Sequence, residues 1–195
     1  MRKIITLVAA ILLAAPALNA QTEAEQLSDN TEHITFLGVE IGGRLKDFMK
    51  KLSKVEGVNI YNENTAFADL DGKKKVTITP LETYESKIVY AVDTKYLWSK
   101  DWNELTGEYF RLAEVYEKKY GTPDTINDGS VFKKDPTETF NMGKLINGEI
   151  RFERIWHTGN SDSITLMIKP IQLKNWAGII IRYEIGPEKY INTAE

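Results

Sequence analysis

One long amphipathic segment, residues 102–120, constrains the fold most, because it separates two strand-rich parts of the chain. Asp101 and Glu104 match a capping box at its start, and Gly121 followed by Pro123 matches a helix end. Apolar side chains recur along the segment at steps of three and four, the spacing of one helix face; they are Trp102, Leu105, Tyr109, Leu112, Tyr116 and Tyr120. The pattern predicts a helix that buries this face against a sheet.

The segments around this helix have the alternation of apolar and polar residues that is typical of strands. Before the helix, the sequence predicts a first strand at 33–37, a turn region at 38–43, a short helix at 44–54, and strands at 58–61, 65–70, 75–79 and 88–94. After it, strands are predicted at 131–133, 150–157, 164–168 and 179–185, with an irregular insertion at 135–148. Asp71-Gly72 predicts a hairpin, because both central positions of a type I′ turn need positive φ.

This order (strand, helix, strands, long helix, strands) predicts an α+β fold with a curved antiparallel sheet covered by two amphipathic helices. It also fits two helix-then-strands units, although no residue-level repeat supports a duplication. We expect a single domain at 33–187, an ordinary domain length. Residues 21–32 are polar and acidic and predict a disordered leader, and residues 188–195 predict a polar tail.

Residues 1–20 match a secretory signal peptide that is cleaved before Gln21. Arg2 and Lys3 form the basic start, residues 4–15 the apolar stretch, and Ala20 the small residue at the cleavage point. The apolar stretch is shorter than the roughly 20 residues that a membrane-spanning helix needs, and no later segment approaches that length. The sequence thus predicts a soluble exported protein of the periplasm or the cell exterior, without a transmembrane segment.

The composition excludes several functional classes. The chain contains no cysteine, which rules out thiol nucleophiles, cysteine-ligated zinc, iron–sulfur clusters and disulfide exchange. The formal net charge is −3, and it becomes −5 once Arg2 and Lys3 leave with the signal. An acidic chain lacks the concentrated Lys and Arg that nucleic acid requires, so nucleic acid is not expected as a partner.

Two motifs resemble a known group of exported bacterial proteins. Residues 36–43 read FLGVEIGG and precede Leu45 and Phe48, which resembles the strand–turn–helix opening of many exported bacterial proteins of unknown function. Residues 119–123 read KYGTP, which is similar to the helix end of the same group. Some of these proteins resemble the β-lactamase-inhibitor-protein fold, and the small lipoprotein of the outer-membrane assembly machinery has a related architecture. The resemblance implies a BLIP-like α+β fold and assigns no functional residue.

No catalytic or metal-binding pattern stands out. His33 and His157 are the only histidines, and neither has the spacing of a metal site or triad. His157 and Asp162 could couple across a turn, where a loop-anchoring hydrogen bond is the favoured interpretation. Asp69 and Asp71 resemble the start of a calcium loop, but lysines follow where the bidentate Glu is needed, so a hairpin is favoured.

Glu82 and Glu85 are the remaining acidic candidates, since paired carboxylates act as acid and base in glycoside hydrolysis. Solvated loop charges are the favoured interpretation of this pair. The sequence therefore predicts no enzymatic activity, no cofactor and no metal.

Aromatic side chains are the last candidates for a site. Trp98, Trp156 and Trp176 lie at predicted strand ends or in loops, where an indole can stack on a sugar or anchor a protein interface. Packing within the sheet is the competing interpretation. The sequence predicts a non-catalytic binding or interaction domain whose partner is another envelope or secreted protein, or a glycan. The alternatives are a carbohydrate-handling protein (a lectin-like module, or a weak glycoside hydrolase using Glu82 or Glu85) and a structural accessory of the cell envelope.

Overall fold

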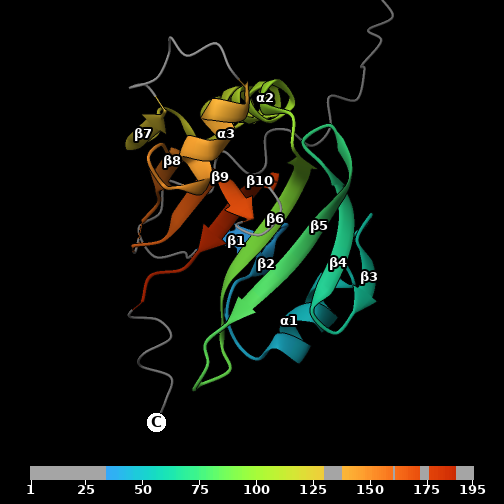
Figure 1. Ribbon diagram of the computed structural model, residues 1–195. Helices are drawn as coiled ribbons and strands as arrows, with labels where there is room; N and C mark the ends of the chain where they lie inside the picture. The colour runs from blue at the N-terminus through green and yellow to red at the C-terminus, as the bar shows by residue number, and fades with distance from the viewer. Residues whose placement is uncertain (1–33, 130–137, 160, 172–175, 188–195) are drawn as a thin grey trace, which may run out of the picture.

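The computed structural model describes residues 34–129, 138–159, 161–171 and 176–187, and Figure 1 shows how their elements are arranged. The helices among these residues are α1 (Leu45–Leu52), α2 (Trp102–Tyr120) and α3 (Glu138–Ile146). Two short strands, β1 (Thr35–Phe36) and β2 (Val39–Glu40), form a hairpin of their own. The other strands form one sheet: β3 (Asn59–Asn62), β4 (Thr65–Leu70), β5 (Lys73–Glu82), β6 (Val89–Ser99), β7 (Thr125–Asp128), β8 (Phe152–His157), β9 (Ser163–Ile171) and β10 (Trp176–Glu184).

The strands of this sheet pair antiparallel in the order β3-β4-β5-β6-β10-β9-β8-β7, which runs from right to left in Figure 1. This confirms the predicted α+β class with an antiparallel sheet. Helix α1 precedes β3 to β6 and helix α2 precedes β7 to β10, with α3 inserted between β7 and β8. Each half of the chain thus supplies four neighbouring strands that follow a helix. The two halves meet where the last strand of each, β6 and β10, pair.

Helix α2 begins and ends at the residues that the sequence predicts. The Asp101 side chain accepts a hydrogen bond from the Glu104 amide at 3.0 Å, as a capping box requires. The reciprocal bond differs from the prediction, because the Glu104 carboxylate accepts from the Ser99 hydroxyl at 2.6 Å and the Asp101 amide donates to Ser99 Oγ at 3.0 Å. Ser99 therefore links the end of β6 to the start of α2. Gly121, with φ of 82°, ends the helix.

The core lies between the helices and one face of the sheet. Helix α2 contributes Leu105 and Leu112, which are fully buried, and α1 contributes Phe48 and Leu52. The sheet meets them with small and branched side chains, as expected for a face that packs on helices; they include Ala66, Ala68, Val76, Ile78, Ile164, Leu166, Ile179 and Ile181.

The predicted hairpin at Asp71-Gly72 is confirmed, since both residues have positive φ, 49° and 78°. The Asp71 carboxylate accepts hydrogen bonds from the hydroxyls of Tyr96 and Tyr116, the second at 3.3 Å. Arg111 of α2 donates to the Asp71 carbonyl at 2.9 Å. The turn between β4 and β5 is thereby fixed to both β6 and α2, and it serves as a structural joint.

Several elements differ from the sequence prediction. Residues 38–43 do not form only a turn, because 39–40 pair with 35–36 as β2 and β1. Residues 125–128 form the edge strand β7, and 138–146 form helix α3 inside the segment predicted to be irregular. The predicted strand at 131–133 lies outside the described residues. None of the described helices is long and apolar enough to cross a membrane.

Helix α3 was not predicted because Thr139, Asn141 and Gly143, which have low helix propensity, interrupt its stronger helix formers. It contacts α2 and β9, and Met142 and Leu145 are buried in the core. Burial of this apolar side stabilises a helix that intrinsic propensity does not favour.

Candidate binding surface

Within the part of the chain that the structure describes, the sheet has one face under the helices and an opposite face that is partly exposed, although Ala91, Asp93 and Ile180 near the middle of this second face are buried. Along β4, β5 and β9, buried residues alternate with more exposed ones, as strands with one covered face require. Ala66, Ile78 and Leu166 on the covered side are all 0% exposed. Phe67 and Thr77, on the other side of the same strands, remain partly exposed. We call this second side the open face.

An ion pair lies near the middle of the open face. Arg182 on β10 and Asp93 on β6 are direct cross-strand partners, with Nε–Oδ1 and Nη2–Oδ2 distances of 2.7 and 3.1 Å. These hydrogen bonds raise the pKa of the Arg182 guanidinium above its ordinary value. The Asp93 side chain is only 7% exposed and both its oxygens are bonded, so the pair connects the two halves of the sheet rather than offering a reactive group.

A β-bulge in β6 places Trp98 on the open face. The register between β6 and β10 shifts between Ile179 and Ile180, which leaves Tyr96 as an extra residue. Tyr96 and Leu97 both pack on the covered side, and the alternation resumes with Trp98 on the opposite side. Trp98 is 38% exposed.

Gly178 lies beneath the Trp98 indole on the neighbouring strand, as its cross-strand partner. A β-carbon at this position would lie 2.3 Å from both Cε3 and Cζ3 of the indole, so any other residue would displace the ring. Gly178 is not among the site residues predicted from the sequence. A lone glycine in an otherwise apolar strand is a signal for such a close approach.

Trp176 lies two residues before Gly178 and therefore shares the open face with Trp98. Its side chain is partly exposed, and Lys100 Nζ lies 5.3 Å from the indole centroid. Two of the three tryptophans singled out from the sequence are thus on one side of adjacent strands. This is the candidate binding surface.

Trp156, the third tryptophan, is in the core. It is 2% exposed, and its indole N–H donates to the Gly121 carbonyl at 2.8 Å. Trp156 fixes the end of α2 to β8, and a ligand cannot reach it without unfolding that contact. We therefore leave it out of the binding surface.

The buried residue Asp162 joins distant parts of the chain. Its carboxylate accepts hydrogen bonds from the amides of Ile34 at 2.8 Å and Gly186 at 2.7 Å. The amide of His157 donates to the Asp124 carboxylate at 2.6 Å. In these bonds Asp162 and His157 join the chain to other partners, namely Ile34, Gly186 and Asp124, and the predicted coupling of His157 with Asp162 stays a prediction.

The acidic candidates lie in exposed positions. Glu82 ends β5 and lies 3.8 Å from Lys87 Nζ, and Glu85 is exposed in the loop that follows. Asp69 accepts from the Lys75 amide at 2.9 Å as part of the β4–β5 hairpin. Among the described residues, no three His, Asp or Glu side chains are grouped to hold a metal ion. His33 lies outside the described residues.

A group of buried tyrosines lies between α2 and the sheet. The hydroxyls of Tyr116 and Tyr183 share a hydrogen bond of 2.5 Å, and burial raises the pKa of both well above the ordinary value. Burial and the Asp71 carboxylate likewise raise the pKa of Tyr96, and burial is the largest cause of the raised pKa of Tyr109. These phenols hold their protons, which excludes them as general bases and suits a structural network.

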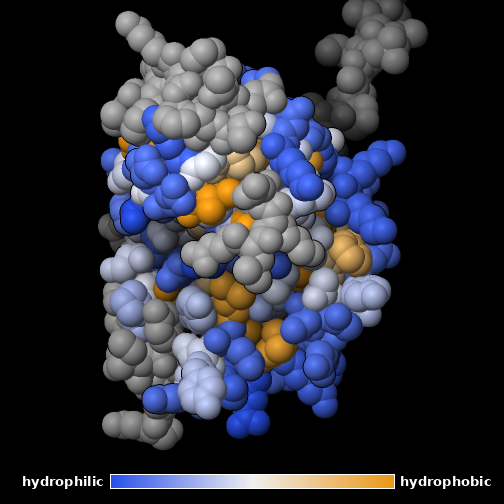
Figure 2. All heavy atoms as spheres, viewed as in Figure 1, coloured by the Kyte–Doolittle hydropathy of each residue, from blue (hydrophilic) through white to orange (hydrophobic). Residues whose placement is uncertain are grey.

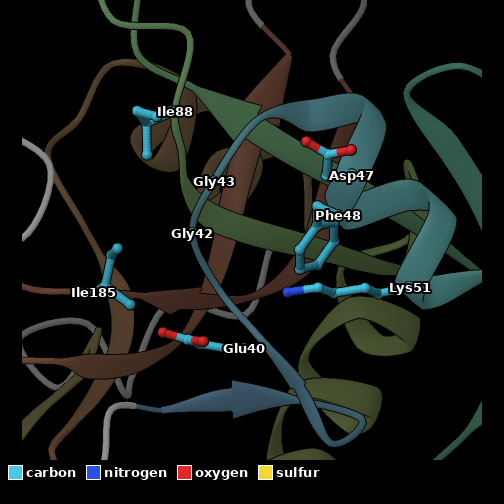
Figure 3. Close-up of a pocket in the computed structure, with 8 residues that line it drawn as sticks. All are labelled: Glu40, Gly42, Gly43, Asp47, Phe48, Lys51, Ile88 and Ile185. Carbon is cyan, nitrogen blue, oxygen red and sulfur yellow. The ribbon is translucent and has the colours of Figure 1, made fainter. Parts of the chain in front are cut away.

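A pocket of about 280 Å³ lies between α1 and the end of β10. Figure 3 shows Asp47, Phe48 and Lys51 on the α1 side, with Ile88 and Ile185 across from them. The residues that line this pocket are far apart in the sequence, so a local sequence pattern does not predict the pocket. The rim carries charges of both signs over an apolar floor, so it does not select one ligand chemistry.

No protein family, curated protein or solved structure significantly matches the chain.

Proposed function

We propose that this protein is an exported, non-catalytic binding domain that holds its partner on the open face of the sheet. The observation that carries the proposal is that Trp98 and Trp176 lie on the same open side of β6 and β10. Tryptophan is enriched at the energetic centres of interfaces because it combines a large apolar surface with a polar N–H. A glycine inside a strand lowers the stability of that strand. A partly exposed tryptophan that needs such a glycine beneath it is therefore not expected on a surface that binds nothing.

Exposed apolar residues elsewhere are scattered, which favours this face over the rest of the molecule. Large exposed apolar side chains on the described residues are Ile60, Tyr61, Tyr84, Trp98, Phe110 and Ile126. Figure 2 shows hydrophobic residues near the middle of the side of the molecule that it presents, with hydrophilic residues around them. Isolated apolar residues are normal on soluble proteins, whereas grouped ones mark binding sites.

We also propose that the fold is of the β-lactamase-inhibitor-protein-like kind, with a curved sheet. The occurrence of a helix followed by four antiparallel strands in each half supports this assignment. An experimental structure in which the two halves do not superpose, or in which the sheet is flat, would contradict it. A role as a structural accessory of the envelope is compatible with the same surface, since it too requires a partner.

A site-specific cross-link tests the binding face. We would replace Trp98 with photoreactive p-benzoylphenylalanine in the exporting host, with Glu114 on the exposed side of α2 as the control position. A single adduct from position 98 and none from position 114 is expected. The captured species must also bind the purified protein and lose at least about tenfold in affinity with Trp98→Ala. Identical adducts from both positions, or none, would contradict the proposal.

The alternative of a glycoside hydrolase is tested separately. Glu82 and Glu85 lie in an exposed segment rather than facing one another across a cleft, which gives little support for acid and base roles. Wild-type protein, Glu82→Gln and Glu85→Gln would be screened for hydrolysis of a glycan panel. Turnover by the wild type that either substitution abolishes would exclude a purely binding role.

A further inference from the structure

The open face carries a discontinuous row of aromatic side chains, in which Phe67 is in register with Ile180 and so lies two residues further along the sheet than Trp98. Trp98 and Trp176 lie on the adjacent strands β6 and β10, and Phe67 lies on β4 with its ring 5.6 Å from that of Tyr61 on β3. Strands in a sheet are about 4.8 Å apart, so β4 and β6 are about 10 Å apart and β4 and β10 about 14 Å. The row is long enough to contact several consecutive units of a chain-like ligand.

Lysines lie over two of these aromatic rings and beside a third. Lys75 Nζ lies 5.5 Å from the centroid of Phe67, and Lys100 Nζ lies 5.3 Å from that of Trp176. Lys169 is the cross-strand partner of Gly178, next to the position that Trp98 covers, and Lys95 pairs with Ile180 in the next row.

The charges of these lysines are available to a ligand. Among the described residues, none of Lys75, Lys95, Lys100 and Lys169 forms a salt bridge with a carboxylate. Three of the four, Lys75, Lys100 and Lys169, are exposed. The same face also carries carboxylates, among them Asp69 beside Lys75 and Glu184 beside Arg182, so the excess of positive charge is local to Lys95, Lys100 and Lys169 near the tryptophans.

We propose that the partner of the open face is an acidic glycan, a chain of sugar rings that bear carboxylate or sulfate groups. This inference rests on the proposed binding function and specifies its ligand. Sugar rings would stack on the exposed indole of Trp98, and their anionic groups would pair with the nearby lysines. Threonine hydroxyls on the same face, at Thr77, Thr79 and Thr165, can bond to sugar hydroxyls.

Two other anionic polymers fit the surface less well. An acidic polypeptide would use the lysines but has no repeated ring to match a row of aromatic side chains. Single-stranded nucleic acid would use both, but it carries a phosphate on every unit and is bound by proteins with a concentrated positive charge, whereas this chain is acidic. Both polymers are included in the test.

Charged and neutral forms of the same glycan distinguish binding of the sugar rings from binding of the anionic groups. Binding would be measured by titration calorimetry for polygalacturonate against its methyl-esterified form, and for dextran sulfate against dextran. Polyglutamate and single-stranded DNA serve as anionic polymers without sugar acids. We expect one acidic glycan to bind at least about tenfold more tightly than its neutral counterpart and than both other polymers.

Variants assign that binding to the surface. Lys100→Gln with Lys169→Gln should weaken binding about tenfold and flatten its salt dependence, and Trp98→Ala should weaken it by a similar factor. Lys118→Gln, on the exposed side of α2, is the matched control and should leave affinity unchanged. Melting temperatures and far-ultraviolet circular dichroism verify that each variant is folded.

The outcomes distinguish this inference from the function on which it rests. Equal affinity for the charged and neutral glycans, or equally tight binding of polyglutamate or DNA, overturns the acidic-glycan assignment. If no glycan binds while the cross-link from position 98 captures a defined partner, the binding function stands and the inference fails. If neither experiment finds a ligand, both fail.

Discussion

The indole of Trp98 occupies the space in which a side chain at Gly178 would lie. A β-carbon there would come within 2.3 Å of two ring atoms, which is far inside van der Waals contact. The glycine and the tryptophan are on strands from different halves of the chain. The pair therefore fixes the indole on the open face. It also requires β6 and β10, the last strands of the two halves, to pack closely at this point.

Gly178→Ala should displace the Trp98 ring and destabilise the fold by about 1–3 kcal/mol, the usual cost of overpacking. The measurement is chemical denaturation followed by tryptophan fluorescence. Gly107→Ala is the control, because a β-carbon at Gly107 in α2 would meet nothing within 4 Å. It should stabilise the protein by about 0.5–1 kcal/mol through helix propensity. Equal effects of the two substitutions would contradict the steric argument.

Leu112→Ala should lower the free energy of unfolding by about 2–5 kcal/mol, because Leu112 is fully buried in the middle of α2. Denaturant melts measure the change. Glu114→Ala, at an exposed position of the same helix, should change stability by less than about 0.5 kcal/mol. A loss that small at Leu112 would mean that this face of the helix is not in the core.

Stability should fall as the pH rises above about 10, the ordinary pKa of tyrosine. Tyr96, Tyr109, Tyr116 and Tyr183 have pKa values raised by burial in the folded protein, whereas in the unfolded chain they ionise near the ordinary value. The unfolded state then binds fewer protons than the folded state, so each such tyrosine lowers stability by about 1.4 kcal/mol per pH unit in that range. Below the ordinary pKa these tyrosines are protonated in both states, and their full contribution to the stability of the folded protein is present.

Phenolate absorbance checks this directly. The chain contains nine tyrosines. At least these four should not ionise during an alkaline titration until the protein unfolds. Tyr116→Phe should reduce the number of non-ionising phenols by one. If all tyrosines ionise while the circular dichroism remains native, the four phenols are accessible to solvent in the folded protein and the prediction is wrong.

The exported protein should begin at Gln21, because residues 1–20 have the three regions of a signal peptide. Mass spectrometry of the intact secreted protein measures this end. Leu12→Arg, which breaks the apolar stretch, should keep the precursor inside the cell with Met1 retained. Secreted wild-type protein that keeps residues 1–20 would disprove the assignment.

Helix α2 and the hairpin at Asp71-Gly72 could be predicted from sequence because each depends on local rules. A cap, a repeating apolar stripe and a terminal glycine specify the helix, and two residues with positive φ specify the turn. The position of Trp98 could not be predicted in this way. Strict alternation places it on the same side as Thr94 and Tyr96, and only the extra residue in the bulge moves it to the open face.

Long-range packing explains the other differences. Helix α3 has weak helix propensity and forms against α2, and β7 is a short edge strand whose residues are mostly exposed. Trp156 and Trp176 look alike in sequence, both near strand ends, yet one donates a hydrogen bond inside the core and the other faces solvent. Trp156 is buried because the end of α2 lies over it. A local sequence pattern does not contain the information that this helix end and Trp156 are neighbours.

Asp162 brings the entry and exit of the described domain to one point, because a single carboxylate holds the amides of Ile34 and Gly186. That point follows the last residues of β10, at the opposite end of the strand from Trp176, roughly 26 Å away at about 3.3 Å per residue. Ile34 and Gly186 therefore both lie at the end of the sheet away from Trp176. Joining the two ends with a short linker and opening the chain at another loop should yield a circular permutant with the same sheet.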